Sequence, residues 1–60
     1  MSLEEQDRKR IIALTTKILE GMIAKGEVDP NDKEGLRRAA QDAAVIAKEA
    51  YLAALDFLGK

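Results

Sequence analysis

An unbroken apolar repeat in the second half of the chain is the feature that most restricts the fold. It consists of Leu36, Ala40, Ala43, Ala47, Ala50, Ala54 and Phe57. Its members alternate in steps of four and three residues, which is the spacing along the contact face of a coiled coil. Because most of them are alanine, they let helix axes approach closely but offer little apolar area each. The repeat therefore predicts a helix that needs large side chains from its neighbours.

The first half of the chain predicts another helix, with a wide apolar face. This face holds Ile11, Ile12, Leu14, Thr15, Ile18, Leu19, Met22 and Ile23. On a helical projection these residues cover about half of the circumference, more than one neighbouring helix can cover. Thr15 lies near the middle of the face, where its hydroxyl is expected to donate to the carbonyl of Ile11. Ser2, followed three residues later by Glu5, matches a capping box at the start of this helix.

One connection separates the two predicted helices. Gly26 suits the left-handed residue that follows a helix end. Asp29 is expected to cap the next helix, with Pro30 at its first helical position. The sequence therefore predicts an all-α protein with one domain, an antiparallel two-helix hairpin. The expected ranges are 1–60 for the domain, about 3–25 for the first helix, 26–29 for the loop and about 30–58 for the second helix.

The expected register leaves one apolar stretch without a partner. In a hairpin closed around the loop, residues whose numbers sum to about 55 lie opposite each other. The charged segment 4–10 then lies opposite residues 46–51, where Tyr51 is expected at the edge with its hydroxyl in water. The end of the second helix, which is the most apolar part of the chain, has only Leu3 and the chain end beside it and so lacks a partner within the hairpin. This stretch comprises Leu52, Leu55, Phe57 and Leu58.

The length of the chain makes association a physical requirement. A chain of 60 residues is too short to build a large core, and such chains usually need disulfides, a metal, exceptional packing or oligomerisation. The chain has no cysteine and no histidine, which excludes disulfides and removes the commonest metal ligand. The sequence therefore predicts that the hairpin assembles with copies of itself into a helical bundle.

Self-association is expected to use the apolar face of the first helix and the alanine-rich face of the second. The predicted contact residues are Ile11, Leu14, Ile18, Met22, Ala43, Ala47, Ala50, Tyr51, Ala54, Leu55, Phe57 and Leu58. A two-fold dimer that forms a four-helix bundle is the simplest closed arrangement. Val45 and Leu52 lie on the back of the second helix, and a second contact there would favour a higher cyclic assembly instead.

The sequence predicts no enzyme, no metal and no cofactor. Carboxylates recur seven residues apart at Asp42, Glu49 and Asp56. Metal sites in helical bundles combine inward-facing glutamates with histidine, and the chain has no histidine. We therefore interpret the carboxylate stripe as a solvated outer face.

The charge pattern does not favour nucleic acid or membrane as a partner. Ten basic and eleven acidic residues give a net charge of −1. The basic clusters at residues 8–10 and 37–38 have acidic neighbours, and no aromatic residue is placed to stack on bases. No apolar run approaches the ~18 residues of a membrane-spanning helix, and the N-terminus lacks the pattern of a signal peptide. We expect a soluble, untargeted protein, cytoplasmic if expressed in a bacterium.

The connecting segment resembles the idealised helix–helix connections of computationally designed helical proteins. It reads Gly26-Glu27-Val28-Asp29-Pro30-Asn31-Asp32-Lys33-Glu34. Residues 36–40 and 47–50 share the likeness, whereas Thr15-Thr16 and the mid-helix Gly21 and Gly35 depart from it. The resemblance implies a self-associating scaffold whose function is assembly itself.

Two alternatives remain open from the residues. One is a small natural bacterial or phage four-helix dimer that binds RNA, DNA or a protein partner. The other is a hairpin that inserts the end of its second helix into an apolar groove of a different protein. Salt-dependent binding to nucleic acid would favour the first alternative, and helicity gained only with another protein would favour the second.

Overall fold

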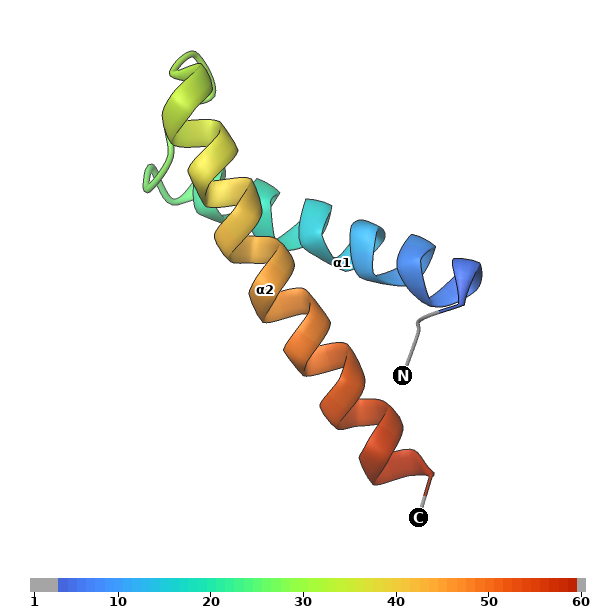
Figure 1. Ribbon diagram of the computed structural model, residues 1–60. Helices are drawn as coiled ribbons and strands as arrows, with labels where there is room; N and C mark the ends of the chain where they lie inside the picture. The colour runs from blue at the N-terminus through green and yellow to red at the C-terminus, as the bar shows by residue number, and fades with distance from the viewer. Residues whose placement is uncertain (1–3, 60) are drawn as a thin grey trace.

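The computed structural model describes residues 4–59, which form two helices. They are α1 (Glu5–Ala24) and α2 (Lys33–Leu58), and residues 25–32 connect them (Figure 1). The helices run in opposite senses and pack against each other, so the predicted all-α hairpin is confirmed. In the part of the chain that the structure describes, neither helix is long and apolar enough to cross a membrane.

The start of α1 differs in detail from the predicted capping box. Glu4 is the cap residue, and its backbone N–H donates to the Asp7 carboxylate at 3.3 Å. Asp7 therefore occupies the position that was predicted for Glu5, which is instead the first helical residue. Ser2 lies outside the described residues. Farther along α1, the Thr15 hydroxyl donates to the carbonyl of Ile11 at 2.7 Å, as predicted.

The end of α1 forms the predicted glycine stop. Gly26 has a φ of 78°, a left-handed conformation that favours glycine. The N–H of Gly26 donates to the carbonyl of Ile23, and the N–H of Glu27 donates to the carbonyl of Met22, both at 3.0 Å. These two bonds make a Schellman motif, which satisfies carbonyls that the helix end would leave free. Val28 then turns inward and is the one buried residue of the connection.

The start of α2 corrects the predicted cap. Asp29 does not cap the helix; its side chain accepts from the N–H of Asn31 at 2.9 Å, and its carbonyl accepts from the N–H of Asp32 at 3.0 Å. Pro30 therefore lies inside a turn, where its fixed φ is also favourable. Asp32 is the cap, and its side chain accepts from the N–H of Gly35 at 3.2 Å.

This correction changes the register of the hairpin. Because α2 begins at Lys33 rather than near residue 30, the connection spans residues 25–32 instead of 26–29. Tyr51 consequently reaches Asp7, and their numbers sum to more than the predicted 55. Gly35 is now explained in part, since a Cβ there would lie 2.6 Å from a carboxylate oxygen of Asp32. Gly21 has open space around it, and nothing in the hairpin requires a glycine there.

The contact between the helices follows four-residue rows. On α2 the buried residues are Ala39, Ala43 and Ala47, which we call the covered row. On α1 the buried residue is Ile11, and half-buried residues lie at four-residue steps on either side of it. Rows of this kind are inclined to the helix axis, and packing them together gives a crossing angle near −50°.

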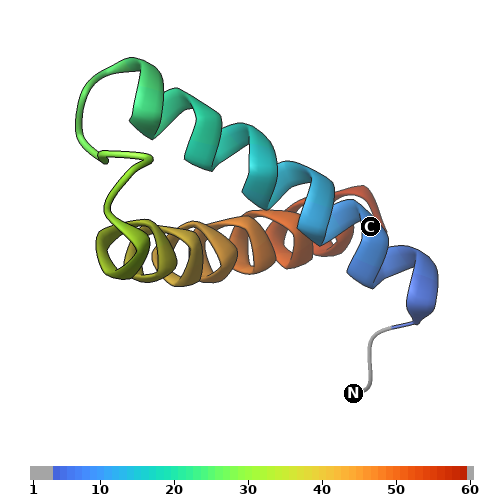
Figure 2. The same ribbon diagram turned by 90° about the horizontal axis from the view of Figure 1, so that it is seen from above.

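The oblique crossing corrects the predicted geometry of the hairpin. Figures 1 and 2 show α1 and α2 crossing and then splaying apart, rather than running side by side along their length. Within the hairpin, α1 therefore covers only part of the predicted coiled-coil repeat. Of that repeat, Ala43 and Ala47 are fully buried, whereas Ala50 and Ala54 are exposed.

Candidate self-association surface

The second half of α2 carries large apolar side chains that the other described residues, 4–59, leave exposed. Phe57 and Leu58 are each 77% exposed, and Ile46 is 54% exposed. Leu52 and Leu55 are also exposed. Among residues 4–59, the predicted lack of a partner for the end of the second helix is therefore confirmed. Leu3, which was expected beside it, lies outside the described residues.

The predicted contact residues fall into three groups. Those buried inside the hairpin, and hence used by the contact between α1 and α2, are Ile11, Ala43 and Ala47. Those half-buried at the edges of that contact are Leu14, Ile18, Met22 and Tyr51. Those exposed on α2 are Ala50, Ala54, Leu55, Phe57 and Leu58. Only the last group is fully available to another molecule.

The structure adds exposed apolar residues that the predicted set did not include. Ile12 on α1 and Ile46 on α2 belong to this group. Ile46 lies four residues before Ala50, and that spacing was the signal in the sequence that identifies it. Val45 and Leu52 are exposed on the back of α2, where a second contact was considered.

A polar cluster joins α1 to α2 where the two helices begin to separate. The Tyr51 hydroxyl donates to the Asp7 carboxylate at 2.6 Å, and Nη1 of Arg10 approaches that hydroxyl at 3.5 Å. The prediction that this hydroxyl would be in water is therefore wrong. Its contact with Tyr51 is the main reason that the pKa of Arg10 is raised above its ordinary value. The cluster therefore links the N-terminal part of α1 to the second half of α2.

The hairpin exposes more surface than a compact protein of its mass. Its accessible surface is 5083 Å². A compact monomer of 6.6 kDa exposes about 3,900 Å², so the excess is about 1,200 Å². A stable protein interface removes roughly 800 Å² from each partner. The excess is thus large enough to supply one side of a stable interface.

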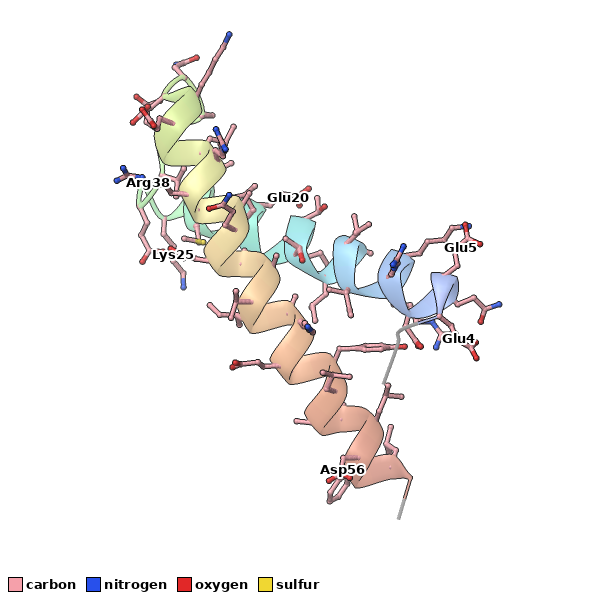
Figure 3. The ribbon with its side chains drawn as sticks, viewed as in Figure 1. Glu4, Glu5, Glu20, Lys25, Arg38 and Asp56 are labelled. Atoms are coloured by element: carbon pink, nitrogen blue, oxygen red, sulfur yellow. The ribbon has the colours of Figure 1, made fainter. Side chains whose placement is uncertain are left out.

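Most of the charged side chains of residues 4–59 lie exposed on the surface of the hairpin. Those labelled in Figure 3, namely Glu4, Glu5, Glu20, Lys25, Arg38 and Asp56, are all exposed. A hollow near the start of α2 is lined by both signs of charge, from Glu34, Arg37 and Arg38 together with Gln41. Among residues 4–59, no group of three or more acidic side chains is arranged to hold a metal ion.

Comparison with known proteins adds no relative. No protein-family model matches the chain, and neither a curated protein nor a solved structure matches it.

Proposed function

We propose that this protein is a self-associating structural scaffold, without catalytic activity, whose hairpins combine into a helical bundle. A dimer is the smallest assembly that satisfies the proposal. The local features of the connection are those that designed helical hairpins use: a glycine stop, an aspartate cap and acidic residues in the first turn. We therefore also propose a designed origin.

The exposed apolar end of α2 is the observation that carries this proposal. Leu55, Phe57 and Leu58 lie within one turn at the end of α2, and Ile46 lies earlier on the same helix; all four are exposed. Monomeric soluble proteins rarely leave a contiguous apolar patch of this kind uncovered. Burying a large apolar side chain contributes about 1.5–3 kcal/mol. A second copy of the same chain is the simplest partner to cover this patch, because it is present in every sample of the protein.

Light scattering across a dilution series, with helicity followed by circular dichroism, tests the proposal. We expect a mass of at least two chains at high concentration. On dilution the mass and the helicity should fall together, because the separated hairpin buries little apolar area. A mass of one chain at every concentration, with full helicity, would rule out the proposal.

Nucleic-acid binding is distinguished in the same experiment. Single-stranded RNA added at low salt should leave the mass and the helicity unchanged, because acidic residues neutralise the basic clusters locally. Binding that weakens steeply with salt would instead support a nucleic-acid partner.

A further inference from the structure

The exposed half of α2 repeats the surface on which α1 docks. The covered row is Ala39, Ala43 and Ala47, and Tyr51 continues it by another four residues. Seven residues farther along the helix lies a second row with the same spacing. This row, which we call the open row, is Ile46, Ala50, Ala54 and Leu58. All four of its residues are exposed.

The two rows share the property that makes docking possible. Each has alanine at two successive central positions, Ala43 and Ala47 in the covered row and Ala50 and Ala54 in the open row. Small residues at these positions let a second helix axis approach to the short end of the usual 8–10 Å range. The open row can therefore receive a helix at the same oblique angle at which α1 crosses the covered row.

The distance between the rows also fits an additional helix. Seven residues advance about 10.5 Å along an α-helix. For helices that cross α2 at about 50°, this displacement separates their axes by roughly 8 Å, which is the packing distance of neighbouring helices. A helix on the open row would therefore lie beside α1 and contact it.

We infer that the open row is occupied by α2 of a second copy, in a two-fold arrangement. This inference rests on the proposed function and specifies its interface. The second copy offers less through α1, because the apolar face of α1 packs on its own α2 through Ile11, and Ile12 is the one large apolar side chain that α1 leaves exposed among the described residues. The outer face of α1, with Lys9, Lys17 and Glu20, is exposed and charged. The open row is the alanine-centred face that each copy still presents.

The open row is also complementary to itself when the two helices are antiparallel. Its large residues are at the ends and its small residues are at the centre. A two-fold axis at the middle of the row places Ala50 opposite Ala54 of the second copy, and Ile46 opposite Leu58 of the second copy. The large side chains of Ile46 and Leu58 then pack against each other at both ends of the contact, and the alanines of the two helices meet at its centre.

Disulfide cross-linking tests this pairing, because the chain has no cysteine of its own. The variants Ala50→Cys and Ala54→Cys are prepared separately, one with an isotopic mass label, and are mixed in equal amounts before oxidation. The inferred contact brings these two positions within the 4.4–6.8 Å Cα separation of a disulfide, whereas each position lies farther from its own symmetry mate. We expect the mixed disulfide to form roughly tenfold faster than either self-disulfide. Ala13→Cys, at an exposed position on the outer face of α1, is the control and should show no preference.

The outcomes separate this inference from the proposed function. Faster 50–50 or 54–54 disulfides would indicate parallel helices and would overturn the inferred arrangement. Random cross-linking in a sample whose mass is two chains would also overturn it, while the proposed self-association would stand. A sample whose mass is one chain at all concentrations would refute both.

Discussion

The covered row and the open row of α2 share a pair of alanines at the same spacing but have different surroundings. Ala43 and Ala47 are fully buried under α1, whereas Ala50 and Ala54, seven residues later, are exposed. The local helix is the same in both places. The difference arises because α1 crosses α2 obliquely and then diverges from it (Figure 1).

This difference shows that the residues on a helix face do not decide by themselves whether a neighbouring helix covers that face. The pattern of alanines specifies a surface that another helix can approach closely. Which helix arrives there depends on the connection, which sets the register, and on the crossing angle, which sets the length of the contact. In this chain both factors direct α1 to the covered row and leave the open row for another molecule.

The largest effect is expected from charges placed at the exposed end of α2. The double substitution Leu55→Asp and Phe57→Asp should give a monomer that has lost most of its helicity. Each side chain contributes about 1.5–3 kcal/mol when buried, and a two-fold dimer loses each contribution twice. Light scattering and circular dichroism measure the result.

The matched control places the same charges where no contact is expected. Ala13→Asp and Gln41→Asp change exposed residues on the two helices and should keep the mass and the helicity. If the Leu55/Phe57 variant were a monomer with full helicity, the hairpin would be stable alone and the open row would need no partner.

A pair of overpacking substitutions compares the two rows directly. Ala43→Leu should destabilise the hairpin by about 1–3 kcal/mol, because no space remains under α1. Ala50→Leu should weaken the dimer instead, so its cost should grow as the protein is diluted. Urea unfolding at several concentrations separates the two effects. Equal, concentration-independent losses would contradict the distinction between the rows.

The polar cluster of Asp7, Arg10 and Tyr51 is expected to limit how far the two helices splay. Tyr51→Phe removes the hydrogen bond to Asp7 and should cost about 1 kcal/mol in urea unfolding, since the pair is only partly buried. The control is Thr16→Val, which removes a hydroxyl that bonds only to the carbonyl of Ile12 within α1. A loss no larger than that of the control would mean that the Tyr51 bond does not hold α1 in place.

The smallest effect concerns the residue that fixes the start of α2. Asp32→Ala should destabilise the protein by about 1 kcal/mol, the usual cost of losing a helix cap. Asp29→Ala should cost less, because Asp29 bonds within the connecting turn. If Asp29→Ala lowered the thermal stability more than Asp32→Ala, Asp29 would be the cap of α2. The start of the helix would then lie about three residues earlier.

Sequence patterns were sufficient for the elements but not for their crossing. Gly26 marks the end of α1 because few other residues adopt its backbone conformation. The start of α2 was ambiguous, since both Asp29 and Asp32 have the chemistry of a cap and Pro30 suits a turn as well as a first helical turn. Only the three-dimensional hydrogen bonds decide between them.

The candidate surface was predicted in part for a related reason. The exposure of Phe57 and Leu58 within the hairpin was predicted because the register places them near the N-terminal end of α1 or beyond it. Ala43 and Ala47 belong both to the 3–4 repeat and to a four-residue row, so the sequence assigned them to self-association although they pack under α1. Ile46 belongs to a four-residue row but not to the 3–4 repeat, so it was not included. The choice between them depends on the crossing angle, which the spacing of apolar residues does not specify.

Hydrogen exchange of the backbone amides, measured at several protein concentrations, tests the central claim most directly. The account predicts that amides of residues 50–58 are as protected as those of residues 39–47 when the protein is concentrated. On dilution the protection of both segments should fall together with the mass. Fast exchange at residues 50–58 in a sample whose mass is two chains would contradict it, because the end of α2 would then be uncovered in the assembly.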